Sequence, residues 1–285
     1  MTVDKTSKAR SLVSGGAVSA KYLSLIVGAL AMALPLLVVL LTSFKTPSEV
    51  ATKGALAPPG NWLNFDNYMT AFTEGKMLTA FGNTTLILVV SLTGTVLIGS
   101  MTAYAIDRFD FRFKRLVVLL FLLATLVPGV TTQVATFQVV NFFGIYDSRW
   151  APIALYMGTD IISVYIFLQF IRGIPVSLDE SARLDGAKSF TIYRRIILPL
   201  LKPAIATVVI IKGTTIYNDF FIPFLYMPSP ELGTISTSLF KFKGPFGAQW
   251  EVISAGAILV ILPTLVVFLL LQRFIYNGFT SGAVK

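Results

Sequence analysis

The sequence predicts an all-α membrane protein that crosses the bilayer six times. Of its 285 residues, 55% are hydrophobic and only 13% are charged, which is typical of chains that cross a membrane repeatedly. The apolar residues also form long runs, and about 20 apolar residues in a helix are enough to cross a hydrocarbon core of about 30 Å. Lysine and arginine collect between alternate runs, so the side on which each connection lies can also be predicted.

Six runs are long enough to span a membrane, and we expect helices at residues 22–44, 77–106, 116–146, 151–171, 203–227 and 252–272. The first follows several basic residues, as a signal peptide would, but it is too long for a cleavable one and we expect it to be retained. The second and third exceed a simple crossing, so tilted, re-entrant or interfacial ends are expected. Each proline within a run removes a backbone donor, which predicts bends at Pro35, Pro128 and Pro263.

The distribution of basic residues predicts how these helices are oriented. Sixteen of the 23 lysines and arginines precede the first run, lie at 108–115 or 172–202, or follow residue 272, whereas six lie in the other connections and Lys212 lies within the fifth run. Because basic connections remain on the cytoplasmic side, both termini and the 172–202 connection are expected there. This predicts a cytoplasmic tail at residues 1–21, one transmembrane domain at 22–277 and a second tail at 278–285.

Composition also excludes several classes of function. The chain has no cysteine and no histidine, so disulfide and thiolate chemistry are excluded, and redox enzymes, zinc sites and histidine-based triads are not expected. We expect no catalytic residue and no metal ligand. The net charge of +9 is typical of nucleic-acid binding as well, but the basic residues flank apolar runs, where they orient a membrane protein. A nucleic-acid partner is therefore not expected.

Three small residues point to close helix packing. Ser91, Thr95 and Gly99 lie four residues apart, so they share one face of the second predicted helix, and small residues allow another helix to approach closely. Packing within this chain and contact with another subunit both fit this pattern.

The 172–202 connection predicts two short helices joined by a turn. Ser177 and Glu180 fit a capping box, in which the serine hydroxyl accepts the amide of residue 180. Gly186 suits the left-handed residue that ends a helix, and Ser189 is expected to cap the second helix. These features describe a compact projection between the fourth and fifth runs.

The spacing within this connection resembles the EAA loop of ABC-importer permeases. In that loop, Glu-Ala-Ala is followed after three residues by Gly, and after nine more by Ile, any residue, Leu and Pro. This sequence departs from the pattern only at Ser181, which replaces the middle alanine. The residues that we assign to the loop are Glu180, Ser181, Ala182, Leu184, Asp185, Gly186, Ile196, Leu198 and Pro199.

The resemblance extends over nearly the whole chain and is strongest to the carbohydrate branch, whose best-known members carry maltose. The segments that resemble this branch are residues 43–49, 65–68, 103–105, 128–129 and 278–285. The resemblance implies a type I ABC importer permease fold with a cytoplasmic coupling helix. It also implies a multi-pass protein of the cytoplasmic (inner) membrane.

The same resemblance implies a set of partners. In such importers two permeases surround a pathway, two cytoplasmic ATPases drive it with ATP and Mg, and an external binding protein delivers the solute. This chain would be one permease for di- or oligosaccharides, surrounded by lipid, binding no cofactor itself. The sequence contains no glycine-rich phosphate loop ending in Lys-Ser or Lys-Thr.

Charged residues within the apolar runs are candidates for the solute path. Asp160, Lys212 and Asp219 lie within the fourth and fifth runs, where an isolated charge is costly unless it is paired or faces water. Lining the path and pairing between helices both explain them. Tyr217, Asn218 and Asp219 resemble a Trp-Asn-Asp segment of the family, and an aromatic ring beside polar groups suits a sugar.

Two alternatives remain open from the sequence. The intramembrane carboxylates Asp160 and Asp219 would suit an ion-coupled secondary carrier, in which they bind the coupling cation. An ABC importer with another cargo, such as a polyol, glycerol phosphate or another polar nutrient, would preserve the same loop.

Overall fold

The chain is mostly helical in the structure, a computed structural model that describes residues 4–129, 131–158, 161–245 and 247–283, without side chains at 4–20, 125, 267–268 and 270–283. Its contacts divide it into two compact units, which are described separately. One unit consists of Met1–Gly75 and Phe242–Pro263, and the other of Lys76–Lys241 and Thr264–Lys285. The predicted all-helical class is confirmed.

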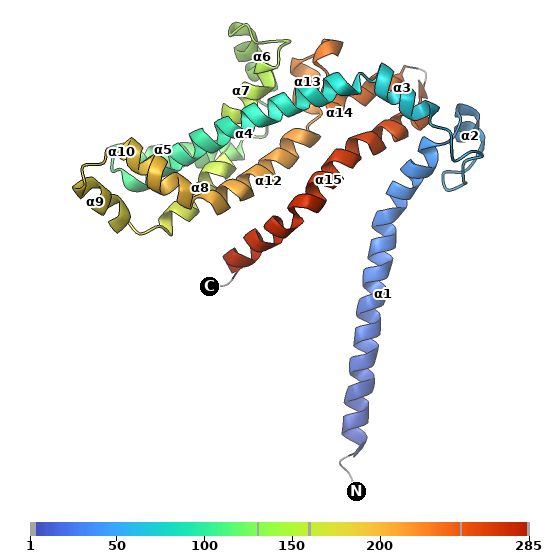
Figure 1. Cartoon of the computed structure of the whole chain (residues 1–285), viewed down its shortest axis with the longest axis horizontal. Coiled ribbons are helices and arrows are strands. Elements are labelled where there is room, and N and C mark those ends of the chain that lie inside the picture. The colour runs from blue at the N-terminus through green and yellow to red at the C-terminus, as the bar shows by residue number, and fades with distance from the viewer. Residues whose placement is uncertain (1–3, 130, 159–160, 246, 284–285) are drawn as a thin grey trace. The chain divides into compact units, whose positions relative to one another are not determined.

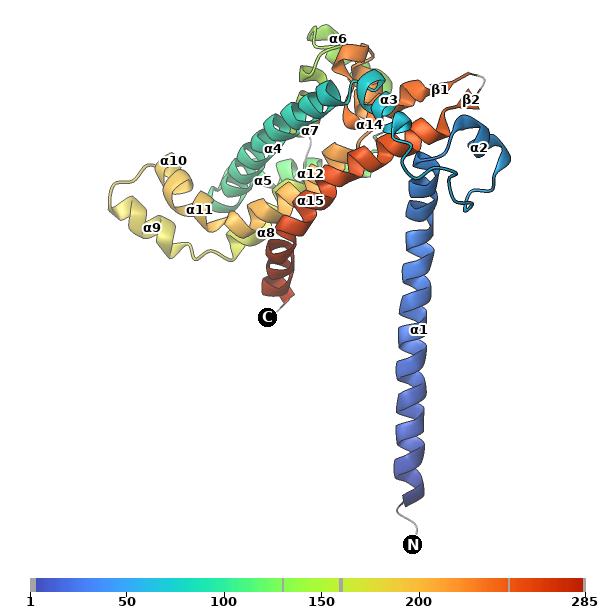
Figure 2. The same ribbon diagram turned by 45° about the vertical axis from the view of Figure 1, so that its right-hand side comes forward.

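The first unit contains a long helix, two short helices and a small hairpin. Its elements are α1 (Asp4–Ser43), α2 (Pro47–Thr52), α3 (Asp66–Glu74), the antiparallel strands β1 (Lys243–Gly244) and β2 (Gly247–Ala248), and the first half of α15 (Trp250–Ala283). The hairpin is seen at the labels β1 and β2 in Figure 2. Helix α1 continues well before the predicted span, and its apolar side chains from Tyr22 to Leu40 are largely exposed.

Buried polar contacts hold the connection between α1 and α3 in place. The side chain of Lys45 is only 1% exposed, and its Nζ donates to the carbonyl oxygens of Gly54 at 3.0 Å and Ala55 at 3.2 Å. Asn67 Nδ2 donates to the carbonyl oxygens of Ser43 at 2.9 Å and Lys45 at 2.8 Å. Since a buried ammonium or amide group is stable only when it is hydrogen-bonded, these contacts explain why the connection is ordered.

Glu49 ties α2 to the rest of this connection. Its carboxylate pairs with Lys53 Nζ at 2.6 Å and accepts the backbone amides of Thr46 at 3.0 Å and Gly60 at 2.8 Å. These bonds, first that from Lys53 and then that from Thr46, lower the pKa of Glu49 from 4.5 to about 2. A lowered pKa stabilises the folded connection at pH values above 4.5, and this contribution disappears as the pH falls toward 2. The ion pair therefore persists throughout the neutral range.

The second unit is a layer of packed helices. Its long elements are α4 (Met77–Arg108), α5 (Lys114–Leu126), α6 (Gln133–Phe142), α7 (Trp150–Gly158), α8 (Ile161–Arg172) and α12 (Lys202–Asn218). Helices α4, α8 and α12 lie side by side (Figure 1). They enclose a core in which Ala103, Phe167, Ile171, Ile197 and Val208 are all buried.

Shorter elements complete this unit at its two ends. One end carries α9 (Ser177–Leu184), α10 (Ser189–Ile192), the π-helix η1 (Tyr193–Ile197) and α11 (Leu198–Leu200). The segment after α12 forms α13 (Phe221–Tyr226), the 3-10 helix η2 (Pro230–Leu232), α14 (Ile235–Ser238) and the 3-10 helix η3 (Leu239–Phe242).

The predicted spans agree only partly with the helices. Among the described residues, Lys21–Ser43 of α1 and α4 are each long and apolar enough to cross a membrane. Two further candidates are broken helices: α7 with α8, bent by 43°, and the segment Ser189–Leu200 with α12, bent by 72°. A shorter apolar segment, Trp250–Val266, lies within α15. The number six therefore remains a prediction.

The third predicted span is not one continuous helix. Helix α5 ends at Leu126 and α6 begins at Gln133, with Pro128 in the gap. A proline lacks the amide that a helix would need, and it disfavours a helical conformation of the residue before it. Accordingly, Val127 is extended (φ −83°, ψ 115°). The bend expected at Pro128 is therefore a complete interruption.

The stripe of small residues on α4 packs within this chain. A Cβ added at Gly99 would lie 3.3 Å from the ring of Phe167 in α8, and Thr95 Oγ1 donates to the carbonyl oxygen of Tyr156 in α7 at 3.4 Å. Of the two interpretations of this stripe, intrachain packing is confirmed.

We expect Gly94→Ala to destabilise the protein slightly, because its new methyl group would displace the side chain of Met157. A Cβ at residue 94 would lie 2.1 Å from Cε, 2.7 Å from Sδ and 2.8 Å from Cγ of Met157. Overpacking costs about 1–3 kcal/mol, and because a methionine side chain can turn aside we expect the lower end of this range, measured as a lower unfolding temperature in detergent. Adding Met157→Ala should recover part of the loss. The control is Gly82→Ala on the same helix, where nothing lies within 4 Å; an equal loss there would refute the packing explanation.

Candidate functional site

Helices α9 and α10 form the helix–turn–helix that the 172–202 connection predicts. Gly186 has φ +83°, in the left-handed region that favours glycine. Its amide donates to the carbonyl of Arg183 at 3.0 Å, and the amide of Ala187 donates to the carbonyl of Ala182 at 2.9 Å. This pair of bonds is a Schellman motif, which ends α9 and redirects the chain. The prediction for Gly186 is confirmed.

The two predicted serine caps are wrong. The N-cap of α9 is Val176, which is already helical (φ −64°, ψ −26°), and its carbonyl accepts the amide of Glu180 at 3.1 Å. Ser177 is therefore the first helical residue, and its hydroxyl makes no capping bond. Ser189 is likewise the first residue of α10, after the extended Lys188. Both helices begin one residue earlier than a serine cap requires.

The motif residues divide into an exposed part and a packed part. Leu184 is 89% exposed, and Phe190 on α10 is 62% exposed. The other exposed motif residues are Glu180, Ser181, Asp185, Gly186 and Pro199. By contrast, Ala182, Ile196 and Leu198 pack against the core formed by α4, α8 and α12. One part of the loop therefore anchors it, while the other part is available to a partner.

A buried cluster of charged and polar groups fixes the inner side of α9 to the end of α4. Asp179 is 2% exposed; its Oδ1 accepts the hydroxyl of Tyr104 at 3.0 Å, and its Oδ2 accepts Nε of Arg108 at 3.2 Å. Arg108 Nη1 also pairs with Asp107 at 2.6 Å, and Nη2 donates to the carbonyl of Ile174 at 2.7 Å. No contact among these residues was predicted, although Tyr104 lies in the 103–105 segment that resembles the carbohydrate branch and Arg108 is one of the basic residues that orient the chain. An Asp-Arg pair at the end of an apolar run was the available signal.

The second half of the loop leads into α12 through an irregular helix. Tyr193–Ile197 form a π-helix, and α11 follows with Pro199 in its first turn. The axis then turns by 72° before α12. Pro203, in the first turn of α12, needs no amide partner there. The π-helix was not predicted.

Four of the five candidate solute-path residues lie on α12 or directly after it. Lys212 and Tyr217 are partly buried within α12, and Asn218 is exposed, with its Nδ2 donating to the carbonyl of Thr214 at 2.9 Å. Asp160 lies outside the described residues. These residues therefore keep their predicted role only as a proposal.

Asp219 has a clear structural task. It follows the last residue of α12, and its Oδ1 accepts the amides of Phe221 at 2.8 Å and Ile222 at 3.3 Å, so it caps the start of α13. Its Oδ2 accepts the hydroxyl of Tyr156 in α7 at 2.9 Å. A carboxylate with three donors joins α7, α12 and α13.

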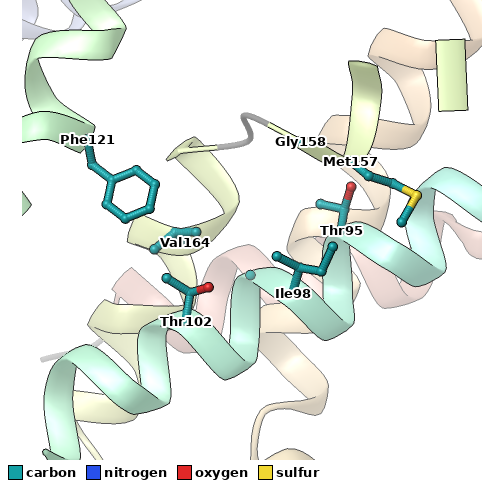
Figure 3. Close-up of a pocket in the computed structure, with 8 residues that line it drawn as sticks. Thr95, Ile98, Thr102, Phe121, Met157, Gly158 and Val164 are labelled. Carbon is teal, nitrogen blue, oxygen red and sulfur yellow. The ribbon is translucent and has the colours of Figure 1, made fainter. Parts of the chain in front are cut away.

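A small cavity lies among α4, α5, α7 and α8. Figure 3 shows Thr95, Ile98 and Thr102 of α4 facing Phe121 of α5 and Val164 of α8. Its volume is about 60 Å³, whereas small-molecule sites usually measure about 300–1,000 Å³. This cavity is too small for a disaccharide.

We expect Asp219→Ala to lower stability and Asp219→Asn to preserve most of it. Alanine leaves Tyr156 and two backbone amides without their acceptor, at a cost of about 1–3 kcal/mol, whereas asparagine retains an oxygen for the cap. Unfolding in detergent measures the difference, with Asp110→Ala, at a fully exposed carboxylate, as the control. If alanine and asparagine destabilise equally, the cap is not the reason. A stable Asp219→Asn variant that no longer takes up solute would show that the charge itself is required.

Residues 95–280 match the family of binding-protein-dependent transport system inner membrane components. That match covers more than half of the chain and includes α9, Gly186 and the whole loop. This chain is a member of that family. The resemblance found in the EAA spacing is therefore confirmed, and the protein is a membrane permease component and not an enzyme.

Several relatives of this permease are similar along most of its length. The probable starch degradation products transport system permease protein AmyC of Thermoanaerobacterium thermosulfurigenes is 33% identical over 254 residues, covering 88% of this chain and 91% of the relative. The galactooligosaccharides transport system permease protein GanQ of Bacillus subtilis (strain 168) is 33% identical over 249 residues, covering 82% and 88%. The maltodextrin transport system permease protein MalD of Streptococcus pneumoniae is 30% identical over 269 residues, covering 94% and 95%.

A solved structure supports the permease fold. A chain from the crystal structure of a bacterial ABC transporter involved in the import of the acidic polysaccharide alginate matches with a TM-score of 0.78, covering 93% of this chain and 98% of the other. At 19% identity this likeness concerns the fold alone. The permease is thus a helical, multi-pass component of the inner membrane.

Proposed function

We propose that this permease carries di- or oligosaccharides as one half of the membrane channel of an ATP-driven importer. The observation that carries the proposal is the exposed α9–α10 hairpin of a family member whose relatives are named for starch products, galactooligosaccharides and maltodextrin. A permease would supply the passage that a sugar needs to cross the membrane. The α9–α10 hairpin would supply the contact with the subunit that hydrolyses ATP.

The hairpin is suited to seat on a cytoplasmic ATPase subunit. Leu184 and Phe190 expose apolar surface, and Glu180 and Asp185 add charge beside it, which is the usual mixture of apolar anchor and polar rim at a protein interface. Two ATPase subunits, each using ATP and Mg, would drive the pair of permeases. A loop that is connected covalently to α8 and α12 would transmit their closure to the membrane helices.

The second permease and the bilayer would cover the surfaces that this chain leaves open. Side chains of α1 from Tyr22 to Leu40 are mostly exposed, and an apolar face of this length is stable only in lipid or against another helix. We propose six crossings with both termini in the cytoplasm, in agreement with the distribution of basic residues. An external solute-binding protein would deliver the sugar to the opposite side.

The test is uptake in a strain from which the chromosomal copy of this chain has been deleted. Plasmid-borne wild-type chain should restore uptake of radiolabelled maltotriose or of a labelled galacto- or arabino-oligosaccharide. Restoration should depend on the compatible ATPase gene and persist when the proton and sodium gradients are collapsed but ATP is maintained. Uptake of labelled glycerol 3-phosphate or a polyol alone would replace the sugar assignment. Uptake without any compatible ATPase would contradict an ATP-driven importer.

A further inference from the structure

The end of α4 that is predicted to be cytoplasmic lies far from the α9–α10 hairpin along the chain, with Arg108 and Asp179 71 residues apart, yet several hydrogen bonds join the two. Ser100, Tyr104 and Arg108 follow one another at intervals of four residues, so they share one face of α4. The Ser100 Oγ and the Tyr193 hydroxyl of η1 are 2.8 Å apart. Tyr104 and Arg108 both reach Asp179 of α9. This face of α4 therefore contacts both α9 and the π-helix η1 that follows α10.

The contacts are those of a rigid junction rather than of a solvated surface. The side chains of Arg108 and Asp179 are only 5% and 2% exposed. Arg108 also donates to the carbonyl of Ile174 in the segment between α8 and α9, and Arg183 of α9 lies 6.0 Å from the ring of Phe109, the residue that follows α4. Because the guanidinium of Arg108 has several partners in fixed positions, it restricts the orientation of α9 relative to α4 as well as the distance between them.

Electrostatics explain why the junction holds together. Asp107 and Asp179 are balanced by Arg108, and Arg172 at the end of α8 lies 3.7 Å from Asp107. Separation of α9 from α4 would expose these charged groups to water or leave them without a partner. In a buried site, a charge that loses its partner is strongly unfavourable. Movement of α9 together with α4 keeps every partner in place.

We propose that Tyr104, Arg108 and Asp179 are positioning residues that make α4 move together with the coupling hairpin when the ATPases close. This inference rests on the proposed function, since it assumes that the ATPases displace α9. The hairpin is joined through the backbone to α8 and α12, and this inference adds α4 as a third helix that the hairpin moves. The force would reach α4 through side chains, whereas it reaches α8 and α12 through the backbone.

The experiment measures distances between spin labels in the assembled complex with its partner permease and ATPases. The chain has no cysteine, so labels can be placed at Leu97→Cys on α4 and Ser177→Cys on α9, both exposed. A second pair joins the α4 label to a label on the partner permease. Each pair is measured without nucleotide and after trapping with ATP and vanadate, in the wild type and in Asp179→Asn. Asp110→Asn, at an exposed carboxylate near the same helix end, is the control.

In the wild type, trapping should shift the distance from α4 to the partner permease, while the α4–α9 distance changes by less than about 2 Å. In Asp179→Asn the α4–α9 distance should change on trapping, and the shift of α4 should fall at least about twofold. The control should behave as the wild type. If Asp179→Asn keeps the wild-type distances in both states, the proposed linkage is wrong.

Two further outcomes are informative. If Asp179→Asn does not assemble, Tyr104→Phe removes a single hydroxyl and keeps the shape; wild-type distances in that variant would overturn the linkage, and a partial separation of α4 from α9 would support it. If trapping changes neither distance in the wild type, the proposed ATP-driven function is wrong. If trapping shifts α4 relative to the partner permease equally in the wild type and in the variants, the proposed linkage is wrong.

Discussion

Gly186→Val should abolish solute uptake while leaving the chain in the membrane. Gly186 has φ +83°, a conformation that costs an ordinary L-residue about 1–2 kcal/mol and a β-branched residue more. Nothing lies within 4 Å of a Cβ added there, so the effect is conformational and not a clash. Relief of the strain would break the bonds from Gly186 and Ala187 to α9 and change the direction of α10.

The matched variants at this position separate conformation from size. Asparagine adopts the left-handed region more readily than other non-glycine residues, so Gly186→Asn should retain much of the uptake, and Gly186→Ala should lie between asparagine and valine. Uptake is measured at equal amounts of membrane-inserted chain, determined by immunoblotting. Equal activities of the asparagine and valine variants would contradict a requirement for left-handed backbone.

Leu184→Asp should detach the ATPase subunits without destabilising the permease. The side chain is 89% exposed, so the isolated chain loses little when it becomes polar. In the proposed complex it is an apolar anchor, and replacing such a residue typically costs 2 kcal/mol or more, which weakens binding by about 30-fold or more. Co-purification of the ATPase with the tagged permease, followed by titration, measures the change.

The control for this prediction is the same substitution at another exposed leucine. Leu63, in the connection between α1 and α3, is 77% exposed, and Leu63→Asp should leave ATPase binding unchanged. Leu184→Met, which keeps an apolar side chain, should bind nearly as the wild type. Unchanged binding of Leu184→Asp would mean that the ATPase docks elsewhere on the chain.

The family and the α9–α10 hairpin were predictable because they depend on local sequence. The spacing from Glu180 to Pro199 does not depend on how the helices pack, and the resemblance that it carried is confirmed. Gly186 was predictable for the same reason, since a residue without Cβ at the end of a short helix has a clear conformational purpose. The apolar runs within α1 and α4 were also evident, because length and apolar composition suffice to identify them.

The caps at Ser177 and Ser189 were predicted wrongly because the start of a helix depends on the path of the chain before it. Arg108 holds the carbonyl of Ile174, and Val176 is already helical when the chain reaches Ser177. The third span was overestimated for a related reason: composition shows an apolar run, but the backbone around Pro128 divides it between α5 and α6.

The sequence by itself determined the helical membrane class, the permease family and the position of the helix–turn–helix loop, since each depends on composition or on short-range spacing. Only the tertiary structure decided which charged groups meet. Asp179 lies 71 residues from Arg108 and 75 from Tyr104 along the chain, and Asp219 lies 63 from Tyr156. No local pattern encodes such distances, because they arise when α4, α7, α8 and α12 pack together and bring polar groups into sites where each needs a partner.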